Sequence, residues 1–492
     1  MAGVLLNLAY AAGLVAFSPV WIYRMIRHGR YRRGWRERFG RAPIRYHNQP
    51  LIWVHCVSMG EVNAARTLVA ELHSQLPDYR VAVSTTTDTG MAAAKKLFAP
   101  DHVVFQWPLD FTFAVRRALG RLRPGLVVLM EGEVWPNFLA ACNRRGIPAV
   151  VVNGRLSPRG LRWKRLGAFA ARVFNRLSAV GVQDEQYAKR FAELGLVPSK
   201  IHVTGMLKYD TAEIADRIAG QEALAEAMGI AAEDRLIVAG GTGPGEEKIV
   251  LDVFAALRGR HPRARLAIVP RKPERFEEVA RLIASSGFSL IRRSQRPDGT
   301  KKLGMTDSHQ DDTGPASAGE TPATREGETG PPNAANRVGG PLPSPRAVLL
   351  GDTMGELRKF YALAYAVFVG RSLVPMGGSD MIESAALGRP TAFGPHTFNF
   401  PQADDLARHG GARIADAREL QEQLEGWLSD EPAATVDGKA AQEFVRSQQG
   451  ATRRNVEMIC RVLGRVPAVV PGAIATQQIS YCGQVRNPRS AI

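Results

Sequence analysis

The chain has 492 residues, of which 45% are hydrophobic and 23% are charged. This balance excludes a chain that is disordered throughout, a fibrous repeat and a membrane protein with many spans. The formal net charge of +17 indicates an anionic partner and leaves nucleic acid, a membrane surface and a phosphorylated substrate as candidates.

The N-terminus is apolar and a basic segment follows it. Val4–Tyr23 carries no charge over twenty residues, long enough to cross a hydrocarbon core as a helix. No basic residue precedes this run, and nine arginines follow it, from Arg24 to Arg45. We therefore predict a membrane anchor over residues 1–26 and a basic juxtamembrane segment over 27–47. This segment would lie against anionic headgroups on the cytoplasmic side. The alternative is a buried helix followed by a solvated basic face.

The first half of the remaining chain alternates short apolar runs with amphipathic, helix-like segments such as Glu61–Leu76, Phe111–Leu122 and Asp184–Leu194. This alternation predicts a parallel, doubly wound sheet. We assign residues 48–225 to this first Rossmann-like domain. Its expected strands are Leu51–Val57, Val81–Thr86, Val103–Gln106, Leu126–Met130, Ala149–Val152, Ala179–Val182 and Ile201–Thr204.

The pattern restarts near Gly229 and predicts a second Rossmann-like domain over residues 226–435, facing the first across a cleft. Residues 296–345 are rich in Pro and Gly and lack aromatic side chains, so we expect a disordered insert there. A C-terminal helix is expected over 436–464, and the tail 465–492 has no readable pattern. The expected strands are Leu236–Ala239, Leu266–Val269, Ala347–Leu350, Ala366–Val369 and Thr391–Phe393.

Polar residues follow the expected strands of the first domain. Glu61 opens a helix after the first strand, where an ordinary first-turn Glu is as good a reading as a functional one. Glu131 and Glu133 follow the fourth strand, and Arg155 and Lys208 follow later ones. Because ligands bind at the carboxyl ends of parallel strands, this set suits a general base beside cations that hold an anionic substrate.

Glycine turns that open helices recur in the second domain, in Gly240–Glu246, Gly351–Glu356 and Gly377–Glu383, and Arg271 and Lys272 follow another strand. Such turns present backbone N–H groups to an anion. One turn alone is weak evidence, but their recurrence on one domain face favours a nucleotide site. No Asp-x-Asp metal site accompanies them.

Seven segments carry a specific resemblance, because they occur in order: VSMGE (57–61), MEGEVWPN (130–137), NGRLS (153–157), GMLKYD (205–210), VPRKPERF (269–276), GDTMGEL (351–357) and GPHTFNF (394–400). The chain resembles the bacterial 3-deoxy-D-manno-octulosonic acid (Kdo) transferases of lipopolysaccharide assembly. The likeness runs from the apolar N-terminus to about Gly450 and omits the insert.

The resemblance implies an α/β GT-B fold and inverting transfer of Kdo from CMP-Kdo to the lipid A precursor, lipid IVA. It also implies that no metal or other cofactor takes part, and that the enzyme works on the cytoplasmic side of the inner membrane. By motif, Glu61 would be the general base, and Glu131 and Lys208 would stabilise the transition state. The implied CMP-binding residues are Pro270, Arg271, Met354, Gly355, Glu356, Asp380, Met381, Ile382 and Glu383.

The chain departs from the family pattern at three places. Asp380 stands where asparagine is usual, GTGPGEE replaces an STHEGEE-like motif, and Lys272 replaces a histidine. These changes concern the nucleotide contacts and leave the reaction class intact. The alternatives are another membrane-associated GT-B sugar-nucleotide transferase and a non-catalytic, membrane-tethered nucleotide-binding protein. Nucleic acid is not an expected partner, because no nucleic-acid-binding motif accompanies the charge.

Overall fold

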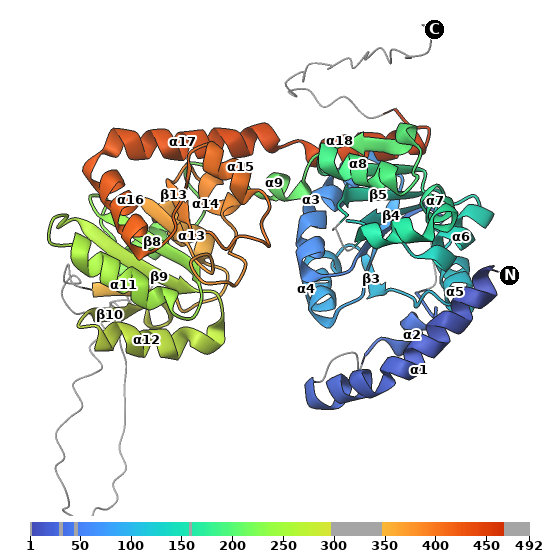
Figure 1. Ribbon diagram of the computed structural model, residues 1–492, viewed down its shortest axis with the longest axis horizontal. Coiled ribbons are helices and arrows are strands. Elements are labelled where there is room, and N and C mark those ends of the chain that lie inside the picture. The colour runs from blue at the N-terminus through green and yellow to red at the C-terminus, as the bar shows by residue number, and fades with distance from the viewer. Residues whose placement is uncertain (1, 29–32, 44–47, 157–159, 297–346, 467–492) are drawn as a thin grey trace, which may run out of the picture. The chain divides into compact units, whose positions relative to one another are not determined.

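The computed structural model describes residues 2–28, 33–43, 48–156, 160–296 and 347–466, and it forms two compact units (Figure 1). The first unit contains residues 1–207 and the chain from 450 onward, and the second contains residues 208–449. Nearly all of the predicted insert and of the predicted tail lies outside the described residues, as do parts of the basic segment.

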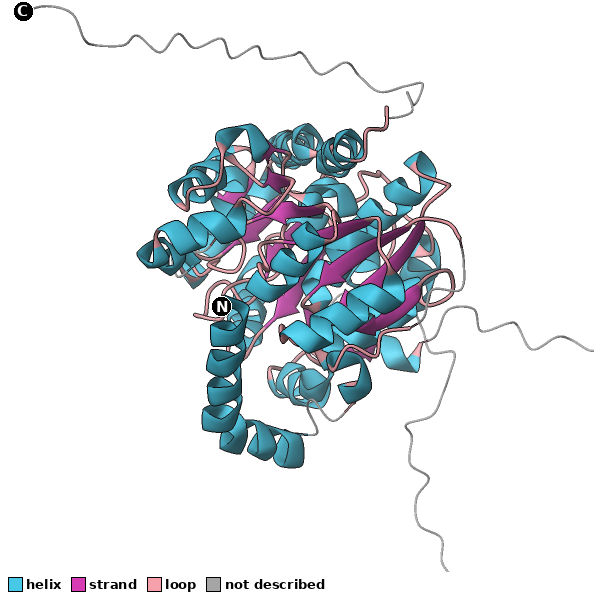
Figure 2. Cartoon of the chain, turned by 90° about the vertical axis from the view of Figure 1, so that its right-hand side faces the viewer, coloured by secondary structure: helices cyan, strands magenta, loops and turns pink. Residues whose placement is uncertain are grey.

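The first unit is built on a parallel sheet of seven strands in the order β3-β2-β1-β4-β5-β6-β7. Its central strands are buried on both faces, as continuous apolar runs such as Leu126–Met130 predict. Figure 2 shows helices on either side of the strands. The strands are β1 (Leu51–Cys56), β2 (Arg80–Thr85), β3 (Val103–Gln106), β4 (Leu126–Met130), β5 (Ala149–Gly154), β6 (Ala179–Val182) and β7 (Ile201–Val203).

Helices cover both faces of this sheet and bury two apolar clusters. In one of them, the Trp53 ring packs 5.3 Å from Phe105 and 5.2 Å from Phe138, measured between ring centres. The helices are α3 (Met59–Gln75), α4 (Asp88–Phe98), α5 (Thr112–Leu122), α6 (Pro136–Arg144), α7 (Ala168–Phe174), α8 (Glu185–Glu193) and α18 (Ala451–Val462), with 3₁₀ turns η1 (Gly160–Leu166) and η2 (Pro198–Lys200).

The second unit repeats the design with seven parallel strands in the order β10-β11-β9-β8-β12-β13-β14. These strands are β8 (Arg235–Thr242), β9 (Ala264–Pro270), β10 (Ser289–Arg292), β11 (Ala347–Leu350), β12 (Ala366–Val369), β13 (Thr391–Phe393) and β14 (Gly411–Arg413). The helices are α9 (Leu207–Thr211), α10 (Gln221–Met228), α11 (Glu246–Leu257), α12 (Phe276–Ser285), α13 (Leu357–Leu363), α14 (Ile382–Ala386), α15 (Ala403–Arg408), α16 (Ala417–Ser429) and α17 (Glu431–Gln448), with 3₁₀ turns η3 (Pro273–Arg275) and η4 (Arg293–Gln295).

The strand orders place one topological switch point in each sheet. In the first sheet the order reverses between β1 and β4, and in the second it reverses between β8 and β12. Ligands of open parallel sheets bind beyond the carboxyl ends of the strands at such points. The residues after these four strands are therefore the ones to examine.

Two predicted boundaries are wrong. The units divide after Leu207 and not at 225, because the connecting helices belong to the second unit, where the Tyr209 ring packs edge-on against Phe444. The C-terminal helix predicted over 436–464 is two helices, α17 and α18, which part where Gly450 adopts a φ of 97°. Thr452 of α18 bonds Thr67 of α3, so α18 completes the first unit.

The apolar N-terminus forms the helix α1 (Ala2–His28). Among the described residues it is the one helix long and apolar enough to cross a membrane, by length and composition, over Gly3–Val20. Large apolar side chains along it, including Leu5, Val15 and Ile26, are exposed.

One arginine of the basic segment does not fit the predicted headgroup-facing role. Arg38 is buried at the end of α2 (Trp35–Arg38) and donates to the Thr86 carbonyl and to Oε1 of Gln106. It therefore anchors its segment to the first sheet.

Candidate functional site

Glu61 lies in the first turn of α3, directly after β1. The Ser58 hydroxyl accepts from the Glu61 N–H, and the Glu61 carboxylate accepts from the Val57 N–H at 2.8 Å and the Ser58 hydroxyl at 3.0 Å. This reciprocal arrangement is a variant of the capping box, in which the carboxylate accepts from the N–H of the residue before the N-cap. The side chain is also nearly buried, with 7% of its surface exposed. Glu61 thus holds the helix start in place, and its carboxylate is withdrawn from water.

The surroundings of Glu61 favour its protonated form. Burial raises the pKa of the Glu61 carboxyl to about 7, and the nearby charges of Glu131 and Glu133 also raise it. The hydrogen bonds from Val57 and Ser58 act in the opposite direction. A carboxyl with a pKa near neutrality is suited to accept a proton from a substrate hydroxyl.

Glu131 follows β4, the strand across the switch point from β1. Its φ of 62° is unusual for a residue other than glycine, and Asn153 near the end of β5 shares this conformation at 54°. Oε2 of Glu131 lies 2.6 Å from Nε of the Arg155 side chain. The backbone N–H of Arg155 also donates to the Glu131 carbonyl, at 2.7 Å. Burial raises the pKa of the Glu131 carboxyl, and the charge of Arg155 opposes this effect. Strained backbone held by specific contacts is typical of functional sites.

The first unit therefore brings together the predicted Glu61, Glu131, Glu133 and Arg155. Burial, and then the charge of Glu131, raise the pKa of the Glu133 carboxyl. Three carboxyls thus share one poorly solvated region with one guanidinium. Such a group can hold a proton near neutral pH and position a hydroxyl, which is the chemistry of a general base.

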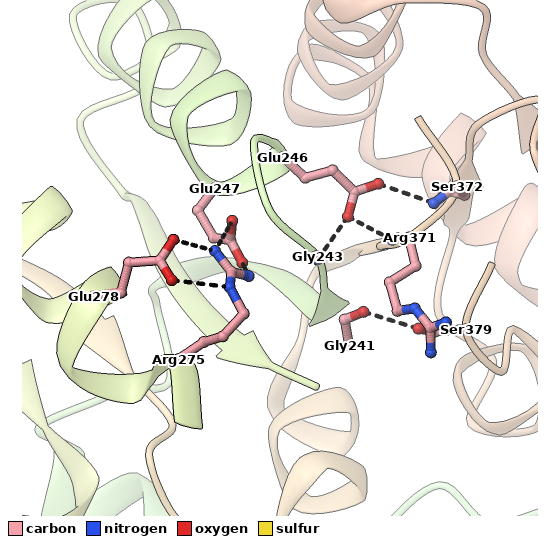
Figure 3. A network of polar contacts seen from close by, with 9 residues as sticks. All are labelled: Gly241, Gly243, Glu246, Glu247, Arg275, Glu278, Arg371, Ser372 and Ser379. Atoms are coloured by element: carbon pink, nitrogen blue, oxygen red, sulfur yellow. Dashed lines mark hydrogen bonds and ion pairs between the residues drawn. The ribbon is translucent and has the colours of Figure 1, made fainter. Parts of the chain in front are cut away.

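The glycine turn after β8 is not the open anion site that its sequence indicated. Figure 3 shows that Glu246 turns its carboxylate back onto this turn and onto the chain after β12. The carboxylate accepts from the N–H groups of Gly243 at 2.9 Å, Arg371, Ser372 at 2.9 Å and Leu373 at 3.0 Å. The Glu246 carboxylate thus occupies the backbone N–H groups that the sequence indicates as donors to a phosphate.

Glu247, the next residue of α11, is equally engaged. Its fully buried carboxylate pairs with Arg275, which also pairs with Glu278 at 2.9 Å (Figure 3). These ion pairs fix η3 and the start of α12 against α11. They hold in place the segment that begins with Pro270 and Arg271.

Pro270 ends β9, and the Arg271 N–H donates to the Thr242 carbonyl at 3.2 Å. This bond joins the ends of β9 and β8 beside the switch point. The Arg271 side chain is exposed, so its guanidinium is available to a ligand.

The predicted segment Met354–Glu356 divides into exposed and engaged residues. Met354 is 67% exposed, and Gly355 has a φ of 88°, which glycine adopts without strain. The Glu356 carboxylate forms a bidentate pair with Arg293, at 2.8 and 2.9 Å, and contacts Lys359 at 3.1 Å. The hydrogen bond from Arg293 lowers the pKa of Glu356 to about 2. Glu356 thus has a structural ion-pair role, and its carbonyl accepts from the N–H groups of Lys359 and Phe360.

Lys208 lies in the second unit, whereas the sequence predicts it in the first domain. Its Nζ lies 3.1 Å from Oδ2 of Asp380 and 4.1 Å from the centre of the Phe400 ring. Asp380 stands where the resemblance implied asparagine, and its Oδ1 accepts from the Ile382 N–H at 3.1 Å. The extra negative charge is therefore matched by Lys208 within the same unit.

Met381 and Ile382 have buried side chains, so only their backbone can reach a ligand. Burial, and then the charge of Asp380, raise the pKa of the Glu383 carboxyl to about 7. The fully buried Tyr361 hydroxyl, near these acids, has no hydrogen-bond partner among the described residues. The predicted turn therefore ends at Glu383, whose raised pKa favours the protonated carboxyl.

No group of three or more His, Cys, Asp or Glu residues suited to a metal occurs in the described part of the chain. The described cysteines, Cys56, Cys142 and Cys460, are buried free thiols. Sequence reasoning missed the structural roles of Glu246 and Glu356. A Glu directly after a glycine turn was the signal for Glu246, but three of its four partners lie 125 to 127 residues away.

Comparison with known proteins identifies the family. A family profile described as 3-deoxy-D-manno-octulosonic-acid transferase (kdotransferase) matches residues 33–211. The 3-deoxy-D-manno-octulosonic acid transferase of Haemophilus influenzae is 31% identical, over 89% of this chain and 94% of that protein. The transferase of the same name from Bordetella pertussis is 33% identical, over 92% of this chain and 97% of that protein. The chain belongs to the Kdo transferase family.

Membership of the Kdo transferases confirms the resemblance read from the seven motifs and makes the protein a glycosyltransferase. The fold is confirmed as well. UDP-GlcNAc 2-epimerase of Neisseria meningitidis superposes with a TM-score of 0.54 at 12% identity, over 84% of this chain and 100% of that one. At this identity the likeness concerns the fold alone: two Rossmann-like α/β domains of the GT-B type.

Proposed function

We propose that this Kdo transferase moves Kdo from CMP-Kdo to a hydroxyl of the lipid A precursor lipid IVA, with inversion and without a metal. The observation that carries the proposal is the Glu61 carboxyl. It is nearly buried, has its pKa raised to about 7, and lies after β1 at the switch point of the first sheet.

Glu61 acts in this proposal as the general base. It takes the proton of the acceptor hydroxyl while the hydroxyl oxygen forms a bond to the anomeric carbon of Kdo. The bond from that carbon to the phosphate oxygen breaks, and its electron pair leaves with CMP. Attack on the face opposite the departing phosphate inverts the anomeric centre. A base of this kind typically contributes 10² to 10⁴ in rate.

Glu131 and Lys208 stabilise the transition state in the proposal. Glu131, fixed by Arg155, keeps negative charge beside Glu61 and so keeps that base strong. Lys208 supplies a cation next to Asp380.

The donor binds to the second unit. We propose that Arg271 and the exposed Met354–Gly355 turn contact CMP, together with the side chains of Asp380 and Glu383. Pro270, Glu356 and Met381 take part through their backbone, since Glu356 is ion-paired and the other side chains are buried. Ile382 takes part by fixing Asp380, to which its N–H donates. Stabilisation of the departing phosphate by cations removes the need for a metal.

The acceptor is a lipid, and the exposed apolar helix α1 supports a membrane location. We propose that α1 holds the enzyme on the inner membrane, with both units on the cytoplasmic side. The remaining basic residues between α1 and β1 add attraction to anionic headgroups.

Incubation of the full chain with CMP-Kdo and lipid IVA, followed by mass spectrometry of the lipid, tests the function. We expect a mass increase by one or more Kdo units, in the presence or absence of EDTA. Glu61→Gln should lower the rate at least a hundredfold while CMP binding persists. Glu71→Gln on the same helix, whose carboxylate bonds only to nearby Gln75 in the described structure, is the control. Unmodified lipid with wild-type enzyme, or more than a tenth of the rate in Glu61→Gln, contradicts the proposal.

A further inference from the structure

Arg371 is the second residue after β12, at the switch point of the second sheet. β12 and β9 both pair with β8, one on each side. Arg371 after β12 and Arg271 after β9 therefore flank the turn that follows β8. Two cations beside a glycine turn, at the carboxyl ends of parallel strands, occupy the position where such sheets hold anionic ligands.

The backbone of Arg371 is held in a strained conformation. Its φ of 59° lies in the left-handed region, which residues other than glycine rarely adopt. The Glu246 carboxylate holds this conformation, because it accepts from the N–H groups of Arg371 and Ser372 (Figure 3) and from that of Leu373. Strain that is maintained by a buried carboxylate serves to aim the Arg371 side chain.

The neighbouring glycine makes room for that side chain. A Cβ added at Gly243 would lie 3.1 Å from Cγ of Arg371 and 2.7 Å from Sδ of Met376. The stem of Arg371 therefore passes against the β8 turn, and a larger residue at Gly243 would require the Arg371 and Met376 side chains to shift. Gly243 stands within GTGPGEE, the segment in which the chain departs from the family pattern.

The guanidinium of Arg371 forms few hydrogen bonds within the described part of the protein. Nη2 donates to the Met376 carbonyl at 3.1 Å, while the buried Nε has no acceptor in the described structure. No ion pair joins Arg371 to a carboxylate among the described residues, and nearby Asp380 is paired with Lys208. A buried N–H without an acceptor costs free energy unless a ligand supplies one.

We propose that Arg371 is a donor-binding residue whose guanidinium holds an anionic group of the nucleotide sugar. This inference rests on the proposed function and adds a contact that the motif comparison did not assign. A CMP-linked sugar acid carries two anions, the phosphodiester and the sugar carboxylate. Arg271 and Arg371 supply two cations on the two sides of the β8 turn. Arg371 takes one of these anions, and the two are distinguishable because CMP has only the phosphate.

The test compares the full chain with Arg371→Gln, Arg371→Lys and Arg371→Gly. Arg418→Gln is the matched control, because Arg418 is an exposed residue of α16 paired with Glu422. Arg371→Gly removes the guanidinium and relieves the left-handed φ, so its thermal midpoint should be at least that of wild type. CMP affinity is measured by calorimetry, and the KM for CMP-Kdo is measured by transfer to lipid IVA.

We expect Gln and Gly at position 371 to weaken donor binding about ten- to a hundredfold, and Lys to restore part of it. Lower CMP affinity assigns Arg371 to the phosphate. Unchanged CMP affinity with a raised KM for CMP-Kdo assigns it to the sugar carboxylate. If both quantities stay within twofold in the folded Gly variant while wild type binds CMP and transfers Kdo, the inference about Arg371 is wrong and the proposed function stands. A wild-type protein that neither binds CMP nor transfers Kdo overturns the proposed function and this inference together.

Discussion

Glu61 combines two demands that pull its pKa in opposite directions. Its capping contacts with Val57 and Ser58 favour the carboxylate, whereas burial and the charge of Glu131 favour the protonated acid. Burial has the larger effect, and the pKa rises to about 7. The same residue therefore orders the start of α3 and remains a base strong enough to act near neutral pH.

We predict that kcat/KM for transfer falls below about pH 7 in wild type, because protonated Glu61 cannot accept the acceptor's proton. The apparent value belongs to the group of Glu61, Glu131 and Glu133, since these carboxyls interact. A pH–rate profile at limiting concentrations of detergent-dispersed acceptor reports kcat/KM and measures this fall on the acid side. A rate that stays constant from pH 8 down to pH 5 would contradict the assignment of a raised pKa to the base.

Stability should respond to the same shift. The folded-state pKa of Glu61 is about 7, above its ordinary 4.5, so its contribution to stability is complete below pH 4.5 and is lost as the pH rises through 7. Glutamine does not titrate. Glu61→Gln should therefore become more stable relative to wild type between pH 4.5 and 7, by up to about 3 kcal/mol, and remain so above. Urea unfolding at pH 4, 6 and 8 measures the difference, with Glu71→Gln on the same helix as the control.

Sequence reasoning located individual side chains where a strand end preceded them. Glu61 and Glu131 were predicted in this way, and the structure brings them together across the first switch point. The roles of Glu246 and Glu356 were not predictable, because each is defined by partners distant in the chain. A carboxylate that binds a ligand and one that binds its own loop have the same local sequence.

At the scale of elements, one side chain joins α11 to the chain after β12. Glu246→Ala would leave four buried or partly buried N–H groups without acceptors, among them those of Gly243 and Ser372. Each unsatisfied buried donor costs about 1–3 kcal/mol. We predict a loss of at least about 3 kcal/mol in the free energy of unfolding, measured by urea titration. Glu233→Ala, at an exposed site in the same unit, should stay within about 0.5 kcal/mol.

The pairing of β10 with β11 constrains any change to the insert. The two strands are adjacent and parallel, so the chain from Arg292 must return along the sheet before Ala347. A crossover of this kind needs about a dozen residues, and a two-residue turn cannot make it. We predict that replacing residues 297–346 with a 15-residue Gly/Ser linker preserves soluble expression and transfer. Replacement with a four-residue turn should disrupt the second sheet.

Circular dichroism and transfer assays on the two linkers measure this outcome. Equal activity from both would contradict the parallel pairing.

β10 itself, and β14 at the other end of the sheet, were not predicted. They are short edge strands, SLIR and GAR, and lack the continuous apolar run that burial on both faces imposes on the central strands. The central strands were predictable for that reason.

At the scale of the whole molecule, α1 is bound to the first unit by polar contacts near its N-terminus. Asn7 exchanges hydrogen bonds with Thr112, and the Tyr10 hydroxyl donates to Asp110 at 3.0 Å. Asp110 in turn accepts from the Asn137 N–H at 3.0 Å. Asn7 and Tyr10 thus attach α1 to the first unit. Its exposed apolar side chains remain for a lipid surface.

Removal of residues 1–28 should separate membrane attachment from chemistry. The truncated protein loses the exposed apolar side chains of α1, so we predict that most of it leaves anionic vesicles in a sedimentation assay. The remaining arginines between residues 30 and 45 would hold the rest by charge, and this fraction should fall steeply between 0.05 and 0.5 M salt. Transfer to detergent-dispersed lipid IVA should persist, because Glu61, Glu131 and the second unit are retained.

A variant of the full chain separates membrane attachment by α1 from the contact of α1 with the first unit. Tyr10→Phe removes the hydrogen bond to Asp110 and keeps every exposed apolar residue, so it should sediment with vesicles as wild type does. If the truncated protein stays on vesicles at high salt, α1 is not the anchor. If it binds CMP and melts cooperatively but cannot transfer in detergent, α1 forms part of the acceptor site. In that case Tyr10→Phe, which loosens α1 at Asp110 without removing it, should also raise the KM for lipid IVA.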